Sequence, residues 1–214
     1  MNRTGEAGQG SVDGSIDGSV EGSIRRTVAA LRARNVETLV VDDGAQALAK
    51  LKELVPEGSV IFNNTSDTLD SIGYTDFVRG NPKYRNLHDG MEAETDPVKQ
   101  RDLRRRATLA DYFIGSVQAI AETGEVVVAS GSGSQIAAYV YNAEHLIWLA
   151  GTQKICPSLS DAIDRVRGYT LQRHDSWLVG RGRTAAPIGK LMIFESEVVA
   201  GRITMILIKE SLGW

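Results

Sequence analysis

The fold of this chain is decided by the stretch Ala121–Lys154, which reads AETGEVVVASGSGSQIAAYVYNAEHLIWLAGTQK. Within it, Val126–Ala129 is a short apolar run, rich in β-branched residues and followed by a Gly/Ser-rich loop, which is typical of a buried strand. We expect a helix after that loop and a second buried strand at His145–Ala150. The order strand, loop, helix, strand therefore predicts an α/β unit.

Two loops of this unit are candidate anion-binding sites. The first carries only small or polar side chains, so an anion could approach its backbone N–H groups at the start of the helix. It consists of Ser130, Gly131, Ser132, Gly133, Ser134 and Gln135. The second contains Gly151 and Thr152 and ends at Lys154, whose ammonium group would add a full positive charge. The alternative is that both loops only connect strands to helices.

A third polar loop follows a short apolar run at Ser59–Phe62, which is predicted to be a strand. Ligands of open α/β sheets bind at the carboxyl ends of the strands, so we expect the three loops to converge there. This loop supplies the candidate ligand-binding residues Asn63, Asn64, Thr65, Ser66 and Thr68. Helix capping would also explain its hydroxyl groups.

Strands and helices alternate in the rest of the chain as well. Good N-cap residues precede apolar helical patterns at Asp43 and Ser158, and Asp96-Pro97 opens a further helix. Further strands are expected at Val36–Val41, Leu191–Glu195 and Ile203–Ile208. This alternation predicts an α/β fold: a mainly parallel open sheet with helices on both faces and an antiparallel hairpin at one edge.

Three segments stand apart from this pattern. Residues 1–23 repeat Gly-Ser-Val/Ile-Asp/Glu, and isolated apolar residues between glycines cannot offset the entropy of ordering. We therefore predict a flexible low-complexity tail at 1–23 and one α/β domain at 24–214. Tyr74–Glu94 is predicted to be an irregular loop, and Gln172–Gly189 a long basic, glycine-containing segment.

Composition limits the function classes that are open to this chain. A net charge of −3 and a pI near 5.7 argue against nucleic acid as a partner. The single Cys156 excludes an intramolecular disulfide and a cysteine-ligated zinc or iron–sulfur cluster within the chain. No apolar run approaches the roughly 20 residues of a membrane span, and the N-terminus lacks an apolar signal core, so we expect a cytoplasmic location.

Cofactor and metal motifs are incomplete. Gly131 and Gly133 do not extend to a dinucleotide-binding motif, because Ile136 replaces the third glycine and no acidic residue ends the next strand. The three histidines are far apart in the sequence, without the paired spacing of metal ligands. We therefore expect no cofactor and no metal ion.

Two sets of charged residues are further candidates. Glu122 lies in a turn beside the anion-binding loops, where partial burial would suit a base or nucleophile acting together with Lys154. The alternative is that Glu122 fixes the turn by accepting hydrogen bonds. The basic run at Arg101 and 104–106 is expected to be a solvated helix face, with the binding of an anionic ligand as the alternative.

Six short segments recur in a characteristic order and spacing: Ser66–Leu69, Ala110–Gly115, Ala121–Gly124, Ser130–Gln135, Gly151–Ile155 and Gly189-Lys190. Taken together, they resemble the LUD domain, the lactate-utilisation domain of the LutC/YkgG type, from about Ile24 to the C-terminus. The resemblance implies a fold related to ribose-5-phosphate isomerase and the CoA transferases (NagB/RpiA/CoA-transferase-like). It also implies a bacterial role in oxidising L-lactate to pyruvate beside partners that carry iron–sulfur clusters. Since this chain has no cysteine-rich segment, it looks like the cluster-free component.

The leading hypothesis is therefore an accessory protein that binds a small anionic ligand or a partner and performs no redox chemistry itself. One alternative is an isomerase-like or transferase-like enzyme that acts on a phosphorylated or CoA-linked metabolite. Another is a regulatory domain that senses a metabolite. Whether the chain is an enzyme, and whether it forms a homo-oligomer, the sequence leaves open.

Overall fold

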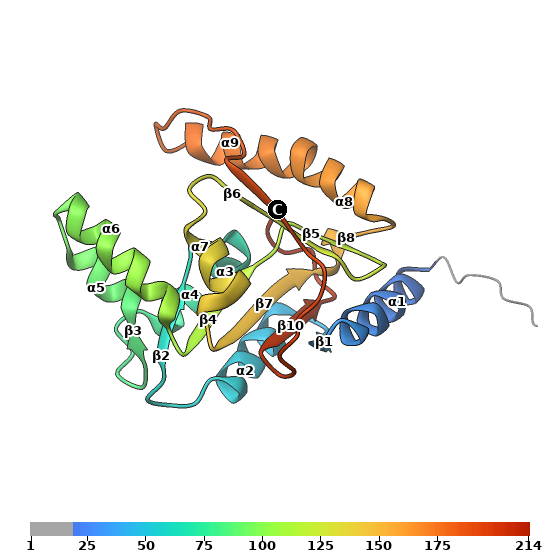
Figure 1. The fold of residues 1–214 in the computed structure, drawn as a ribbon, viewed down its shortest axis with the longest axis horizontal. Helices are drawn as coiled ribbons and strands as arrows, with labels where there is room; N and C mark the ends of the chain where they lie inside the picture. The colour runs from blue at the N-terminus through green and yellow to red at the C-terminus, as the bar shows by residue number, and fades with distance from the viewer. Residues whose placement is uncertain (1–18) are drawn as a thin grey trace, which may run out of the picture.

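The strands of this chain form two sheets in the computed structural model, which describes residues 19–214 (Figure 1). All neighbouring strands of the larger sheet are parallel, in the order β1-β10-β7-β4-β2-β3. Their bounds are β1 Val36–Val41, β10 Ile203–Ile208, β7 His145–Gly151, β4 Tyr112–Ser116, β2 Val60–Asn63 and β3 Arg85–Asn86.

The smaller sheet is mixed and has the order β8-β5-β6-β9. Its strands are β8 Ile155–Cys156, β5 Ala119–Ala121, β6 Val126–Ser130 and β9 Lys190–Phe194. β5 is parallel to β8 but antiparallel to β6, and β6 is antiparallel to β9. The chain passes from the larger sheet into the smaller one directly after β4, so the two sheets share one continuous segment.

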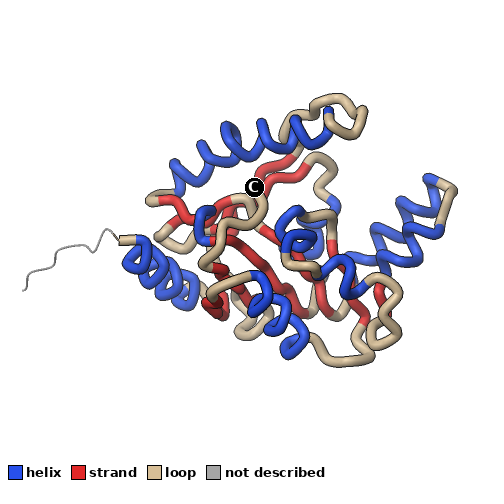
Figure 2. The backbone as a smooth tube through the Cα atoms, turned by 180° about the vertical axis from the view of Figure 1, so that it is seen from behind, coloured by secondary structure: helices blue, strands red, loops and turns tan. Residues whose placement is uncertain are grey.

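Helices lie on both sides of the strands, as the view from behind shows (Figure 2). The α-helices are α1 Val20–Ala33, α2 Gly44–Leu54, α3 Asp67–Ser71, α4 Tyr74–Val78, α5 Leu87–Ala93, α6 Pro97–Arg106, α7 Ser134–Ala137, α8 Leu159–Arg165 and α9 Leu171–Val179. Short 3-10 turns occur at η1 (Ala107–Leu109) and η3 (Thr152–Lys154). The π turn η2 (Ala138–Asn142) extends α7, and the π turn η4 (Val166–Thr170) joins α8 to α9.

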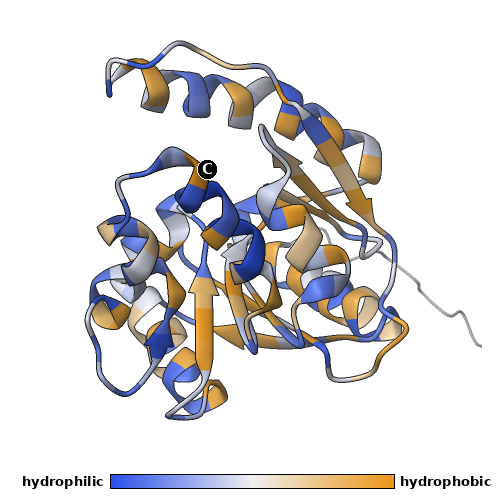
Figure 3. Cartoon of the chain, turned by 60° about the vertical axis from the view of Figure 1, so that its left-hand side comes forward, coloured by the Kyte–Doolittle hydropathy of each residue, from blue (hydrophilic) through white to orange (hydrophobic). Residues whose placement is uncertain are grey.

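Alternate side chains of the central strands enter different cores, because successive side chains of a strand point to opposite faces. In β7, Trp148 packs in the core between the two sheets, whereas Leu149 packs on the other face with α2 and α3. A third, smaller core lies between the smaller sheet and α8, where Val127 packs with Ala162. Figure 3 shows the strands as the apolar interior of these layers. This explains why the β7 sequence is apolar on both faces.

The structure confirms the predicted fold class, a mainly parallel α/β sheet with helices on both faces. The antiparallel hairpin β5–β6 belongs to the second sheet and does not extend an edge of the main one. Its position follows from burial on both faces: Val127 contacts the α8 layer, while Val126 and Val128 pack in the core between the sheets.

Three segments differ from the prediction. Residues 1–18 of the predicted tail lie outside the described residues, and α1 already begins at Val20 because the Ser19 side chain caps it by accepting from the Gly22 N–H. The segment Tyr74–Glu94 contains α4, β3 and α5, with Tyr74 buried. The segment after Thr170 continues as α9, whose Leu178 is buried.

Candidate functional site

Three strand ends define one edge of the main sheet. β2, β4 and β7 are parallel neighbours that end at Asn63, Ser116 and Gly151. The loop after β2 leads into α3, and the turn after β7 leads through η3 to Lys154. The carboxyl ends of these strands therefore bring together segments that are far apart in the sequence.

Lys154 is the centre of this edge. Its side chain is buried, with 1% of the residue exposed. The Nζ atom donates to Thr68 Oγ1 at 2.9 Å and to Ser116 Oγ at 3.0 Å, and the Ser116 hydroxyl donates to Thr68 Oγ1 at 3.1 Å. A protonated lysine has three N–H donors. Within residues 19–214 these hydroxyls use two of them, which leaves one donor for a ligand.

The environment of Lys154 disfavours its charged form. Burial lowers the pKa of Lys154 to about 7, the positive charge of Arg165 acts in the same direction, and Asp67 opposes them. Desolvation penalises an ammonium ion that lacks a counter-charge. Close to neutral pH the amine is therefore divided between its neutral and charged forms, and an anion beside it would favour the charged form.

A cavity of about 130 Å³ opens beside this amine. One wall is the loop after β2, which contributes Asn64, Thr65, Ser66 and Thr68. Another part of the lining is aromatic: the rings of His174 and Trp177 of α9 stack with centroids 6.1 Å apart, and the Trp214 ring centroid lies 5.7 Å from that of His174. The cavity thus combines a buried amine, several hydroxyls and a flat apolar surface. We call it the lysine cavity.

A second cavity, of about 360 Å³, brings two of the predicted loops together. We call it the central cavity. It shares Gln118, His174 and Trp214 with the lysine cavity. The predicted residues on its walls are Asn63, Asn64, Thr65, Ser130, Gly131, Ser132, Ser134 and Gln135.

Hydrogen bonds fix the walls of the central cavity. Ser130 Oγ accepts from the Gly133 N–H at 2.9 Å and donates to Gln135 Oε1 at 2.8 Å, so the loop closes on itself. Gly133 has a φ of +86°, which favours glycine at this turn. Asn63 is 3% exposed, and within the described part of the chain its Oδ1 has no hydrogen-bond partner. Such a buried acceptor is a group that a bound ligand could satisfy.

Gly151 and Thr152 lie apart from these cavities. A Cβ atom at Gly151 would come within 2.6 Å of the Glu210 carbonyl oxygen, so the C-terminal segment packs directly on this turn. The Gln153 side chain donates to the carbonyl oxygens of Leu212 and Gly213, at 2.8 and 3.2 Å. The turn after β7 therefore contributes Lys154 to the site and anchors the segment that carries Trp214.

Glu122 faces helix α1. Its Oε2 accepts from Arg26 Nε at 2.7 Å, and its own N–H donates to the Cys156 carbonyl at 2.8 Å. Hydrogen bonds from Arg26 and Ser23 lower the pKa of Glu122 below its ordinary value. Glu122 follows the carboxyl end of β5, whereas Ser116 precedes that strand, so β5 separates Glu122 from the hydroxyl that binds Lys154. A catalytic role for Glu122 stays a prediction.

Several residues of the site were not predicted as ligand-binding residues. Ser116 and Gln118 lie where the chain crosses from β4 of the larger sheet to β5 of the smaller one. His174 belongs to α9, which was not predicted, and Trp214 arrives from the end of the chain. The polar residues Ser116 and Gln118 within an apolar run were the available signal.

Metal and membrane features are limited among the described residues. No group of three or more His, Cys, Asp or Glu side chains is placed to hold a metal ion in residues 19–214. In the same residues, no helix combines the length and the apolar composition needed to cross a bilayer.

Comparison with known proteins adds a family and a fold. The sequence model described as the LUD domain matches residues 24–184. A crystal structure of a DUF162 family protein from Deinococcus radiodurans has a TM-score of 0.54 and 10% identity, and the match covers 89% of this chain and 98% of that one. At this identity the likeness supports the fold alone. For eIF2B beta from Chaetomium thermophilum, the TM-score is 0.32 at 13% identity, over 54% of this chain and 43% of that one. No curated protein matches this chain.

Proposed function

Because this chain belongs to the LUD domain family, which is related to lactate-utilisation proteins, we propose that it binds a small anionic metabolite in a lactate-oxidising system. In this proposal it is the cluster-free component of a bacterial cytoplasmic system that converts L-lactate to pyruvate. The observation that carries the binding role is the buried Lys154 amine, which lies beside a cavity and has a third N–H donor that the two hydroxyls do not use.

The size and chemistry of the lysine cavity favour a small anion. Its volume of about 130 Å³ lies below the roughly 300–1,000 Å³ of sites for larger ligands. Burying a cation without a counter-charge is costly, so an anion beside Lys154 stabilises the charged amine. Asp67 and Asp70 also line the cavity, but both are exposed, and solvent screens their repulsion of an anion.

The test of the binding role is calorimetric titration with L-lactate and with pyruvate between pH 6 and pH 9. Affinity should be highest below pH 7 and should fall by up to about tenfold per pH unit above it, because the anion binds the protonated amine. Lys154→Met should abolish binding. Lys50→Met is the matched control, since it removes the same charge from an exposed ion pair with Glu53 on α2. Binding that is independent of pH, or intact in Lys154→Met, would contradict the proposal.

The accessory role needs a separate test. Partners that carry iron–sulfur clusters enter the proposal through the family relation alone. Lactate oxidation with an artificial electron acceptor should therefore require such proteins and should not occur with this chain by itself. Turnover by the purified chain would contradict the accessory role without affecting the binding role.

A second candidate function is an enzyme that acts on a phosphorylated or CoA-linked metabolite. The observation in its favour is the pKa of Lys154 near 7, since a neutral amine at physiological pH can accept a proton or attack a carbonyl group. For such an enzyme, Lys154→Ala should eliminate turnover while the protein stays folded. For the accessory role, the same variant should change only the affinity for a ligand or partner.

A further inference from the structure

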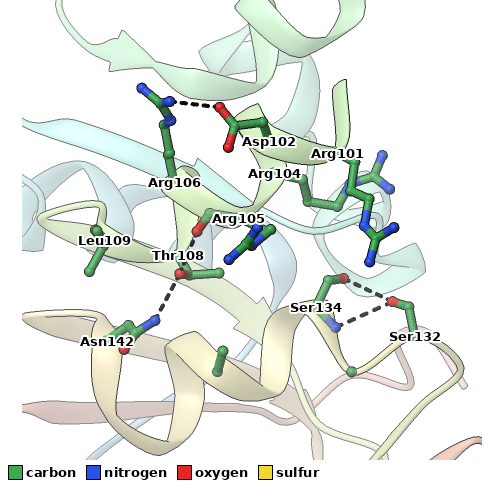
Figure 4. A pocket seen from close by; sticks show the side chains of 12 residues that line it. Arg101, Asp102, Arg104, Arg105, Arg106, Thr108, Leu109, Ser132, Ser134 and Asn142 are labelled. Carbon is green, nitrogen blue, oxygen red and sulfur yellow. Dashed lines mark hydrogen bonds and ion pairs between the residues drawn. The ribbon is translucent and has the colours of Figure 1, made fainter. Parts of the chain in front are cut away.

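A groove of about 760 Å³ separates helix α6 from the Ser132–Ser134 loop (Figure 4). Helix α6 (Pro97–Arg106) is ten residues long, and none of them is buried. A helix is normally held by an apolar face that packs on the core. Packing on the core therefore does not explain the composition of α6.

The arginines of α6 form one wall of the groove. Figure 4 shows Arg101 and Arg105 with their guanidinium groups directed toward the loop below, while Arg106 is directed to Asp102. Arg106 Nη2 lies 2.8 Å from Asp102 Oδ2. Within residues 19–214, the guanidinium groups of Arg101, Arg104 and Arg105 form no ion pair. Three positive charges thus border the groove, while the Asp102 carboxylate that also lines it is paired with Arg106.

The opposite wall leaves room for a ligand to approach the backbone. Its side chains are small: Ser132 Oγ donates to Ser134 Oγ at 3.1 Å and accepts from the Ser134 N–H at 3.2 Å. Arg104, Ser132 and Ser134 also line the central cavity, so the groove adjoins that cavity.

We propose that this groove binds the diphosphate group of a ligand. Guanidinium groups bind phosphate oxygens through paired, charge-assisted hydrogen bonds. A diphosphate carries several negative charges, so it balances three arginines better than a ligand with a single carboxylate does. The volume lies within the range of small-molecule sites. This site is separate from the anion site at Lys154 and extends the ligand-binding surface to a second, multiply charged group.

The test is calorimetric titration with sodium pyrophosphate at low ionic strength. The wild-type chain should bind it with a saturable isotherm. Arg101→Gln and Arg104→Gln should each weaken binding by about tenfold, since each removes a charge-assisted contact. Lys99→Gln is the matched control: it removes one positive charge from the same helix at a residue outside the groove, and it should change the affinity less than about threefold.

Three outcomes would overturn the proposal. The first is the absence of saturable pyrophosphate binding. The second is an equal loss in Lys99→Gln, which would indicate diffuse attraction to a basic helix. The third is arginine-dependent binding of an Asp/Glu-rich peptide without binding of pyrophosphate, which would make α6 a protein-docking surface.

The Lys154→Met variant separates this proposal from the proposed function. It should bind pyrophosphate as the wild type does while losing the small anion. If Lys154→Met instead failed to bind pyrophosphate, the diphosphate site would be the lysine cavity, and the groove would be ruled out as that site. Circular dichroism should show every α6 variant folded, because no residue of that helix is buried.

Discussion

The buried amine of Lys154 makes the stability of the folded chain depend on pH. Its pKa is lowered from 10.5 to about 7 in the folded state, so the unfolded chain binds more protons between those values. The free energy of unfolding should therefore rise with pH across that window, by at most about 1.4 kcal/mol per pH unit from this group. Below about pH 7 the destabilisation caused by burying the charged amine is fully present and no longer changes with pH.

Urea unfolding of the wild type and of Lys154→Met at several pH values between 6 and 10 measures this contribution. The difference between the two curves isolates Lys154 from the other groups that titrate. The stability of Lys154→Met relative to the wild type should be greater at pH 6 than at pH 10, because methionine carries no charge to desolvate. A constant difference across the range would mean that Lys154 has an ordinary pKa.

A second residue-scale prediction concerns Gly115 and Tyr139. The Tyr139 hydroxyl donates to the Ser116 carbonyl oxygen at 3.0 Å, and a Cβ atom at Gly115 would overlap that hydroxyl. Tyr139→Phe should cost about 1 kcal/mol by removing the buried hydrogen bond. Gly115→Ala should cost about 1–3 kcal/mol through overpacking.

Thermal or chemical unfolding of both single variants and the double variant tests this contact. The effects should not add, and Gly115→Ala should cost less in the Tyr139→Phe background by about 0.5 kcal/mol or more. Additive effects would mean that the tyrosine moves aside at no cost. Because Ser116 binds Lys154, this contact also helps to position the site.

At the scale of elements, Arg202 joins the start of β10 to the π turn η2. Its guanidinium group donates to the carbonyl oxygens of Ala138, Tyr139 and Ala143 and pairs with Glu197 at 2.6 Å. Both side chains of the pair are 8% exposed. Burial alone would raise the pKa of Glu197, but hydrogen bonds from the Val199 amide and Arg202 bring it below its ordinary value.

Glu197→Gln should destabilise the fold by about 3 kcal/mol or more, because it leaves a buried guanidinium without its counter-charge. Since the pKa of Glu197 is lowered by folding, the wild type has this stabilisation above the unfolded pKa of about 4.5 and loses it as the pH falls through the folded value. Urea unfolding at pH 7 and pH 3 is the measurement. The destabilisation should be smaller at pH 3, and a loss that is the same at both values would contradict an ionised pair.

The elements themselves show what sequence can and cannot predict. Local signals were sufficient for three helices: Asp43, Asp96 and Ser158 each cap the expected helix through their side chains. The second sheet could not be predicted, because β8 and β5 are very short and pair with each other across more than thirty residues of chain. Helix α9 was missed because its continuation through a π turn has no local stop or start signal.

The same distinction applies to the site. The parallel order of strands predicts that the loop after β2 and Lys154 meet at one edge, and the structure places them together. His174 and Trp214 join them only through tertiary packing, which no spacing in the sequence indicates. For Ser116, the available signal was a polar residue within an apolar run. Ligand binding by the loop after β2 and by Lys154 stays a prediction.

At the scale of the whole molecule, charged pairs attach helix α1 to the smaller sheet. Arg26 pairs with Glu122 at 2.7 Å, and Arg34 pairs with Glu125 and Glu195 at 2.5 and 3.2 Å. The Arg26–Glu122 pair is partly exposed, with 35% and 19% of the side chains accessible. Solvent therefore screens it, and a contribution of at most about 1 kcal/mol is expected.

Glu122→Gln separates a structural role of this carboxylate from a catalytic one. With a structural role, the free energy of unfolding should fall by up to about 1 kcal/mol and the affinity at Lys154 should not change. Urea unfolding and calorimetric titration of the same preparation give both quantities. A stable variant that has lost turnover on a phosphorylated or CoA-linked substrate would favour the catalytic alternative.

The aromatic wall of the lysine cavity has one more consequence. Of the three tryptophans in the sequence, Trp148 lies in the core between the sheets, whereas Trp177 and Trp214 border the cavity. Indole emission depends on the polarity and charge around the ring, so a molecule that enters should alter the fluorescence of two tryptophans and leave the third as an internal reference. The chain thus contains its own optical reporter, and occupancy could be followed in real time without a label.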